Sequence, residues 1–567
     1  MRCPPSVLGA LAAAAALVGV SSCSTVFAPD RNARAPELEG FGNLEMRVVT
    51  VVPAAQRLFA RGMLQSYAFN QPEAARAFKA ALAQDPSCAM CAWGVAKVAG
   101  PNINDGGRDD LDDARRHLAW ASARVSPSAP RERALIEALS ERYGPQADAA
   151  KVAVPEAAIC TSGGAAKAHP LDIVYAARMR ALADAYPDDP DILVLYAEAV
   201  MIATNDDWWD KKTGLPAGEI GVVTERLERA LVAHPAHTGL NHFLIHAADS
   251  SRQPERATAA ADRLGGLAPA APHLLHMPAH IYVRTGRYPD AVRVNEAAVA
   301  AQAKQKATLT AQGFSQSFDW DGHNRDFLWF AALTEGRAEL AMAQARVLAA
   351  RATQVKNATG EFLRGLPLLT LVRLERWDDV LAEPMPTGAA GLAVPMTDYA
   401  RGMALVRTGK VDAARERSIA LQAALDQPVL KGATVMGDDP ARNVLEILAS
   451  RLVAELAAAD GRADASLGAL VRGIELETAL GASEPPLLAS SSRLAMGDLM
   501  LRLQRWSDAE RAYRDELVAQ PASGWALTGL ERALAGQGRA DEARRARAEA
   551  EQAWAGADAS VRRLAMR

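Results

Sequence analysis

The sequence predicts an all-α fold in which helical hairpins repeat along the chain. The first observation is composition: 50% of the 567 residues are hydrophobic but only 5% are aromatic. The apolar residues are therefore mainly Ala, Leu and Val, which suit closely packed helices better than an all-β fold. The second observation is a recurrence of small and apolar residues at intervals of 34 positions, and such a period indicates a repeat array.

One repeat near the start of the array shows what each position does. Its key residues occupy positions 4, 8, 20, 24, 27 and 32 of a 34-residue unit: Leu58, Gly62, Ala74, Phe78, Ala81 and Pro86. Small residues at positions 8 and 20 let the two helices approach closely, and the Pro at position 32 ends the second helix. The pattern resembles the tetratricopeptide (TPR) signature. We therefore expect a TPR right-handed superhelical solenoid with a concave groove.

Further units follow in order along the chain. They begin near residues 238, 272, 322, 361, 395, 490 and 524. Interruptions of the period predict loops at residues 100–107, 154–167, 205–218, 306–321, 383–392 and 427–440. These boundaries divide the folded chain into an N-terminal TPR array (46–305), an insertion loop (306–321) and a C-terminal TPR array (322–567).

Residues 1–22 have the proportions of a signal peptide. Arg2 precedes an apolar run that is too short to span a bilayer comfortably. Val20-Ser21-Ser22-Cys23 resembles a bacterial lipobox, which predicts acylation of Cys23. The alternative is an ordinary secretory signal in which Cys23 is incidental. We expect an exported, periplasmic protein that is lipid-anchored to the outer membrane, with residues 23–45 as a flexible tether.

The histidines are concentrated in one part of the chain. Seven of the ten lie within residues 234–280. Four of these seven form two H-x-x-x-H pairs, and residues four apart share one face of a helix. The pairs are His242 with His246, and His276 with His280. The second pair follows the first by one 34-residue period, so we expect both pairs to face one pocket.

The same register brings further polar side chains to this pocket. Resemblance to TPR proteins implies that positions 2, 5, 9, 12 and 13 of the first helix line the groove, and these positions include His273, Asp249, His323 and Asp326. Imidazole and carboxylate ligands suit transition metals such as Zn, Cu or Fe. The predicted metal ligands are His242, His246, His276, His280, His323 and Asp326. Two alternatives stay open: a metal-free polar pocket for a peptide or small anion, and solvated or structural histidines.

Residues 223–290 also carry a more specific resemblance. The strings Asn241-His242-Phe243-Leu244-Ile245-His246 and His276-Met277-Pro278-Ala279-His280-Ile281-Tyr282 resemble a family of bacterial exported TPR proteins, often lipoproteins. The resemblance extends over nearly the whole mature chain and brings no established activity. Asp326 stands where many members have His, which bears on metal preference. Glu484-Pro485-Pro486 lacks the aromatic residues that follow it in the family. The resemblance therefore does not predict a ligand contact in this C-terminal segment.

The cysteines add one local motif. Cys88-Ala89-Met90-Cys91 follows Pro86 at the expected start of a helix, where the helix dipole lowers a thiol pKa. In an exported protein this spacing suits a local disulfide, a metal site or simple packing. Because no βαβ pattern surrounds it, we favour packing or a disulfide over redox catalysis.

Charge and motifs exclude several other functions. The formal net charge of -4 predicts no surface for nucleic acid, and no P-loop, dinucleotide fingerprint or H-E-x-x-H motif is present. Our first hypothesis is a cell-envelope TPR binding protein whose groove holds a transition metal or a metal-bearing or peptide ligand. The alternatives are a metal-dependent hydrolase or oxidase that uses the same cluster, and a metal-free protein-protein scaffold. The expected partners are a protein or peptide in the groove and the membrane through the lipid anchor. The sequence indicates no oligomeric state.

Overall fold

The structure is a computed structural model that describes residues 27–44, 46–104, 107, 111–144, 168–204, 208–315, 318–386, 391–437, 439–480 and 483–565. The expected signal peptide, the expected lipidation site Cys23 and the expected loop at 154–167 lie outside these residues. Within them, no helix is long and apolar enough to cross a membrane.

The N-terminal array is a succession of short antiparallel helices. In chain order they are α1 (Pro53–Tyr67), α2 (Gln71–Gln84), α3 (Ala89–Val98), α4 (Asp112–Ser122), α5 (Pro130–Arg142), α8 (Pro170–Ala185), α9 (Pro190–Ala203), α10 (Ile220–Ala233), α11 (Thr238–Asp249), the 3-10 helix η1 (Pro254–Ala257), α12 (Thr258–Leu267), α13 (Pro272–His276), α14 (Pro278–Arg284) and α15 (Tyr288–Ala311). Several of these helices have Pro in their first turn, where its missing N–H costs nothing. Pro278 divides α13 from α14 within one repeat, because its ring cannot continue the helical hydrogen bonds.

The C-terminal array continues the same hairpin pattern. Its elements are α16 (Asp321–Glu335), α17 (Ala338–Arg351), the 3-10 helix η2 (Ala352–Gln354), α18 (Ala358–Arg373), α19 (Trp377–Ala382), α20 (Ala393–Arg407), α21 (Val411–Ala424), the 3-10 helix η3 (Pro428–Leu430), strands β1 (Thr434–Val435) and β2 (Asp439–Pro440), α22 (Ala441–Ala459), α23 (Ala463–Thr478), α24 (Ser492–Arg502), α25 (Trp506–Ala519), α26 (Gly524–Gly536), α27 (Ala540–Ala553) and α28 (Ala559–Ala565). The two strands form a single antiparallel pair. The predicted all-α TPR solenoid is therefore confirmed.

Small residues allow the close helix packing that the repeat pattern predicts. A Cβ atom on Gly62 would lie 2.6 Å from the ring of Phe78, so the close approach of α1 and α2 requires a glycine at this position. Glycines allow the same close packing in the last repeats. A Cβ atom on Gly497 would lie 2.5 Å from the ring of Tyr513, and one on Gly529 would lie 2.1 Å from it. One aromatic ring thus fills the space that two glycines leave open.

Two segments differ from the prediction. The expected loop at 306–321 begins later, because α15 continues to Ala311. Residues 306–311 contain no Gly or Pro, and buried Leu309 holds this last turn against the core. The expected flexible tether at 23–45 packs against the array over its described part. Leu38 and Phe41 are buried there, and Gly40 accepts a backbone hydrogen bond from Ala270 at 2.9 Å.

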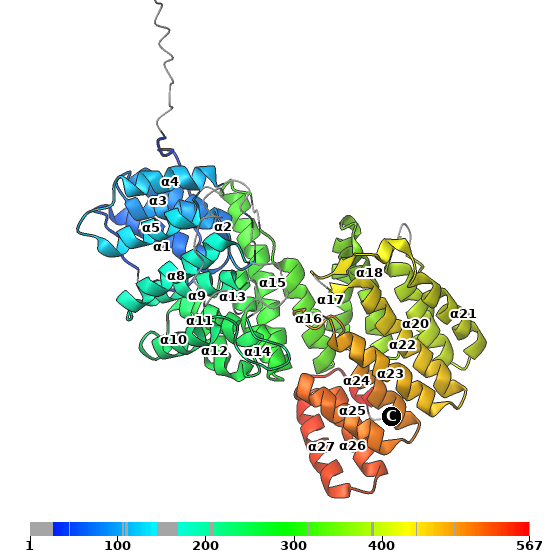
Figure 1. Ribbon diagram of the computed structural model, residues 1–567. Helices are drawn as coiled ribbons and strands as arrows, with labels where there is room; N and C mark the ends of the chain where they lie inside the picture. Colours follow the sequence, from blue (N-terminus) through cyan, green and yellow to red (C-terminus); the bar gives the residue numbers. More distant parts are fainter. Residues whose placement is uncertain are drawn as a thin grey trace, which may run out of the picture.

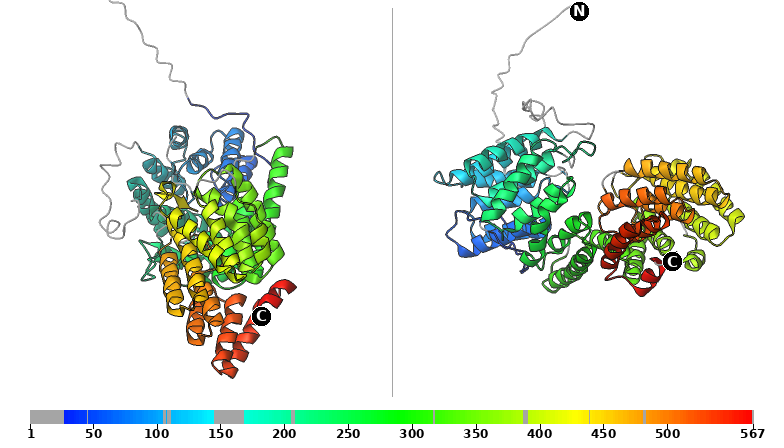
Figure 2. Two further views of the ribbon diagram at one scale, coloured as in Figure 1. Left: turned by 90° about the vertical axis from the view of Figure 1, so that its right-hand side faces the viewer. Right: turned by 90° about the horizontal axis from the view of Figure 1, so that it is seen from below.

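The two arrays lie side by side and meet around α15 and α16 (Figures 1 and 2). The C-terminal array curls back on its own start. Trp525 of α26 donates its indole N–H to the carbonyl of Leu333 in α16 at 3.0 Å, and the N–H of Asp558 donates to the carbonyl of Gly336 at 3.0 Å. This curl brings the connection between α23 and α24 toward the histidine-bearing helices of the N-terminal array.

Candidate metal centre

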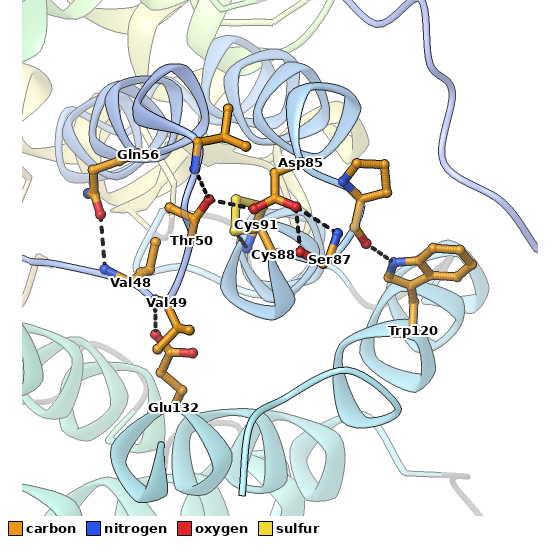
Figure 3. Close-up of a disulfide and its surroundings, with 12 residues drawn as sticks. Val48, Val49, Thr50, Gln56, Asp85, Ser87, Cys88, Cys91, Trp120 and Glu132 are labelled. Atoms are coloured by element: carbon orange, nitrogen blue, oxygen red, sulfur yellow. Dashed lines mark hydrogen bonds between the residues drawn. A yellow bond between two sulfur atoms is a disulfide. The ribbon is translucent and has the colours of Figure 1, made fainter. Parts of the chain in front are cut away.

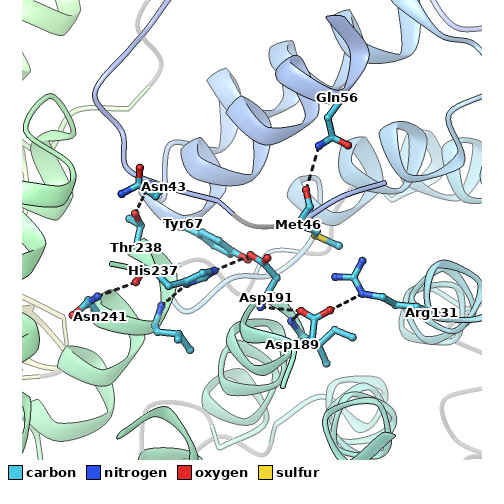
Figure 4. A network of polar contacts seen from close by, with 12 residues as sticks. Asn43, Met46, Gln56, Tyr67, Arg131, Asp189, Asp191, His237, Thr238 and Asn241 are labelled. Atoms are coloured by element: carbon cyan, nitrogen blue, oxygen red, sulfur yellow. Dashed lines mark hydrogen bonds and ion pairs between the residues drawn. The ribbon is translucent and has the colours of Figure 1, made fainter. Parts of the chain in front are cut away.

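Helix α11 carries the first histidine pair, and a buried polar network fixes its start (Figure 4). His237 caps the helix by accepting a backbone N–H at Nδ1. Its Nε2 lies 3.1 Å from Oδ1 of Asp191, which also accepts the hydroxyl of Tyr67 at 2.8 Å. These contacts join α11 to α1 and α9. They set the position of α11, so His237 supports the site by positioning the helix that carries His242 and His246.

Three imidazoles meet beside α11: His242, His246 and His273. Nε2 of His242 lies 3.0 Å from Nε2 of His246 and 3.1 Å from Nε2 of His273. Phe69 packs against all three rings, with centroid distances of 4.7, 5.5 and 4.9 Å. The indole of Trp320 stacks on His273 at 4.2 Å. The first triad therefore presents three nitrogen donors to one point between apolar walls, as a metal site does.

A second triad of the same form lies beside it. Nε2 of His276 is 3.0 Å from Nε2 of His280. His323 of α16 completes the group, with its ring centroid 4.6 Å from that of His276 and 5.9 Å from that of His280. Phe327, one turn along α16, packs against all three rings at 4.7, 4.5 and 5.2 Å. In each triad, one ligand atom per histidine lies within 4.8 Å of the other two.

Three further side chains orient the rings of the second triad. Oδ1 of Asn295 lies 2.7 Å from Nδ1 of His276, and Nδ2 of Asn295 donates to the carbonyl of Ala291 at 2.8 Å. This second bond sets the orientation of the amide, so Nδ1 of His276 is the donor to Oδ1. Nδ1 of His280 lies 2.9 Å from Oδ2 of Asp249 and 3.1 Å from Oε2 of Glu484. It therefore also donates, to carboxylates.

These partners determine what the two Nε2 atoms can do. With both Nδ1 atoms acting as donors, each neutral ring of His276 and His280 offers only a lone pair at Nε2. Two lone pairs that face each other at 3.0 Å require a cation between them, either a proton or a metal ion. Hydrogen bonding of Nδ1 to a carboxylate or amide oxygen is the usual outer-shell support of a metal-binding histidine.

Burial keeps most of the imidazoles in the neutral form that binds metal. It lowers the pKa of His242 and of His323 to about 3. It also lowers the pKa values of His246, His273 and His276 well below the usual value. For His280, burial alone would lower the pKa, but Asp249 and Glu484 outweigh it and raise the pKa to about 10. Protons therefore compete with a metal mainly at His280.

The structure changes one part of the predicted pocket. The repeat register does bring the two pairs near each other. His273 lies 3.1 Å from His242 of the first pair, Nε2 to Nε2, and its ring centroid is 6.3 Å from that of His276 of the second pair. The pairs do not merge into one pocket of four imidazoles, however. Each pair instead recruits a third histidine from the following repeat, because the two imidazoles of a pair, only four residues apart, reach each other before they reach the neighbouring pair. His273 completes the first triad, and His323 completes the second.

Asp326 differs from its predicted role. It lies in neither triad and in no other group of potential metal ligands among the described residues. Its side chain is buried, and burial raises its pKa to about 7. Its position 5 in the first helix of the repeat is equivalent to that of His242 and His276, but an aspartate side chain is shorter than a histidine and does not reach the other ligands.

Three residues support the site through contacts that the sequence did not indicate. Phe69 follows α1, Asn295 lies on the second helix of its repeat, and Glu484 precedes α24 in the other array. Glu484 contacts the site itself, since its Oε2 lies 3.1 Å from Nδ1 of His280. A cavity of about 430 Å³ opens at this place, with walls that include Asp249, His280 and Glu484.

Cys88 and Cys91 form a disulfide in the first turn of α3 (Figure 3). Sγ of Cys88 also accepts the backbone N–H of Cys91 at 3.1 Å, and nearby Asp85 accepts the backbone N–H of Ser87 at 2.9 Å. Both cysteines are fully buried. Because a buried disulfide is closed to attacking thiols, its position favours a structural role over redox exchange.

The fold and the site together define a class: a TPR solenoid with two adjacent triads of buried and partly buried histidines. Neither the protein-family models nor the curated proteins compared with the chain match it. Solved structures that it resembles include a human IFIT1 dimer with m7Gppp-AAAA (12% identity, 89% of this chain and 91% of that chain, TM-score 0.28). They also include the APC/C hetero-tetramer Cut9-Hcn1 (12%, 91% and 97%, TM-score 0.26) and yeast Tom70 (12%, 90% and 94%, TM-score 0.27). Similarity at this level gives no information about the ligand of this chain.

Proposed function

We propose that the protein is a transition-metal-binding TPR protein of the cell envelope, which holds Zn, Cu or Fe in the histidine cluster. One observation carries this proposal: six imidazoles converge as two triads, in each of which one ligand atom per histidine lies within 4.8 Å of the other two. Burying that many polar rings against each other is costly unless their nitrogen atoms are paired. A bound cation supplies the missing partner, and neutral imidazole is a preferred ligand of these metals.

The direct test is metal analysis of the purified mature chain. The protein is stripped with a chelator, reloaded with Zn(II), Cu(II) or Fe(II), and analysed for bound metal after desalting. We expect stoichiometric metal, with most of it lost in the double variant His242→Ala/His276→Ala. His234→Ala is the matched control, because His234 lies in the same histidine-rich segment but belongs to neither triad. A parent protein that binds none of the three metals would contradict the proposal.

The envelope location is a separate part of the proposal and rests on the lipobox-like string at residues 20–23. Export delivers the chain to a compartment where the disulfide between Cys88 and Cys91 is stable. We expect the chain to incorporate labelled fatty acid and to fractionate with the outer membrane, and Cys23→Ser to prevent both. Export of a parent chain that takes up no labelled fatty acid and stays in the soluble periplasmic fraction would favour an ordinary secretory signal.

A metal-dependent enzyme is the second candidate, and the cavity beside His280 favours it. The cavity gives a ligand access to the edge of the second triad, and its walls carry Lys211, Arg284 and Arg493 together with acidic residues. Three histidine ligands leave a coordination position open for water or substrate, as in catalytic zinc sites. Turnover of candidate peptides or small molecules by the metal-loaded protein, absent from the double variant, would separate an enzyme from a binding protein. A metal-free scaffold that binds a protein or peptide in the groove would show partner binding that survives in this variant.

A further inference from the structure

The histidine cluster contains two sets of ligands and not one. Each triad is complete by itself, with its three donors within 4.8 Å of one another, and no such set among the described residues mixes members of the two triads. The nearest rings across the boundary, His273 and His276, have centroids 6.3 Å apart. One ion with nitrogen bonds of about 2.0–2.1 Å can satisfy one triad, but it cannot be bound by both.

We propose that the protein binds two metal ions, one in each triad, as an adjacent pair of unequal sites. This inference rests on the proposed function and adds its stoichiometry and order of binding. The two sites have walls of the same kind: Phe69 packs on the rings of the first triad, and Phe327 packs on those of the second. Each triad thus consists of three imidazoles with one phenyl ring beside them, as we expect for two separate metal sites.

The sites are unequal because their surroundings carry different charge. Asp249 and Glu484 face Nδ1 of His280 in the second triad. These carboxylates attract a cation at Nε2 through the ring and also hold the ring in place. Among the described residues, the first triad has no such carboxylate, and its His242 is hydrogen-bonded to the backbone of Tyr67 instead. Nδ1 of His273 is buried there without a hydrogen-bond partner among the described residues. No group of potential metal ligands among these residues places a carboxylate beside His242 or His246.

The order of binding follows from this difference. The second triad takes the first ion, because Asp249 and Glu484 attract a divalent ion more strongly than the single proton that it displaces from Nε2 of His280. The positive charge of that ion then weakens binding at the neighbouring first triad. A metal titration should therefore have two steps, the tighter step belonging to His276, His280 and His323. Asp249→Asn should weaken the tighter step about 10- to 100-fold, as loss of an outer-shell carboxylate does, and leave the weaker step in place.

The test uses the one partly exposed histidine of each triad, because its removal disturbs packing least. These are His246 in the first triad and His323 in the second. Full-length mature protein is titrated with Zn(II) against a chromogenic chelator, and bound zinc is counted after desalting. The parent should bind two ions per chain. His246→Ala should keep the tighter ion alone, and His323→Ala should keep one ion of weaker affinity.

The possible outcomes separate this inference from the proposed function. Binding of a single ion that either substitution abolishes would overturn the two-ion arrangement while leaving metal binding intact. Two ions that both survive in His246→Ala and His323→Ala would also overturn it, because they would lie elsewhere. Binding of no zinc, copper or iron by the parent would overturn the proposed function itself. Circular dichroism melting of each variant shows whether it is folded, and His246→Gln and His323→Gln replace any alanine variant that is not.

Discussion

Replacing Asn295 by Leu should weaken metal binding at the second triad without removing any ligand. Asn295 is fully buried, and its amide links the carbonyl of Ala291 to Nδ1 of His276. Leucine has a similar size but offers no acceptor, so Nδ1–H of His276 would lose its partner. Loss of an outer-shell partner lowers metal affinity about 10- to 100-fold, which corresponds to roughly 1.4 to 2.7 kcal/mol. The unpaired buried N–H should also cost the metal-free fold about 1–3 kcal/mol.

The assay is competition for Zn(II) between the protein and a chelator of known affinity, with thermal melting in parallel. Asn295→Asp keeps an acceptor at the same position and should retain or strengthen binding. Asn324→Leu is the matched control: Asn324 is buried beside His323, but neither of its amide atoms has a partner among the described residues. That control should keep parental affinity and melt at a higher temperature, because it removes an unpaired buried amide. Parental affinity in a folded Asn295→Leu protein would refute the reasoning about ring orientation.

Two further predictions concern the fold. Burial raises the pKa of Glu516 to about 7 from a usual 4.5, so ionising it destabilises the folded state as the pH rises from about 5 to 8, by up to roughly 3 kcal/mol. Glu516→Gln should therefore raise the melting temperature more at pH 8 than at pH 5.5, and an equal change at both values would count against a buried, titrating carboxylate. Gly529→Ala should cost about 1–3 kcal/mol in denaturant unfolding, because its Cβ would lie 2.1 Å from the ring of Tyr513. Gly468→Ala, in an exposed helical position with open space around it, should instead add up to about 1 kcal/mol, and similar losses in both variants would contradict the steric explanation.

The repeat period was the part of the sequence that carried most structural information. Units expected near 238, 272 and 524 begin as helices at Thr238, Pro272 and Gly524. Local signals suffice here, because Pro opens a helix and small residues mark close contacts between neighbouring helices. The end of α15 was predicted too early in the chain. Packing of buried Leu309 stabilises its last turn, and no local sequence signal marks this contact.

Only the features of the site that follow from the repeat register could be predicted from the sequence. The pairs at His242 and at His276 share one phase of the repeat, so their closeness followed from counting residues. The division into two triads depends on how far each imidazole extends from its helix. The repeat register gives no information about this distance. The contact between Glu484 and His280 could not be predicted, because this carboxylate reaches His280 only through the curl of the C-terminal array.

Crystallographic anomalous scattering from the zinc-loaded protein tests the central claim most directly. We expect two zinc peaks, each bound by Nε2 atoms of one triad at about 2.0–2.1 Å, with Phe69 beside one ion and Phe327 beside the other. Zinc peaks at surface carboxylates only, with both triads free of metal in fully loaded crystals, would contradict the account.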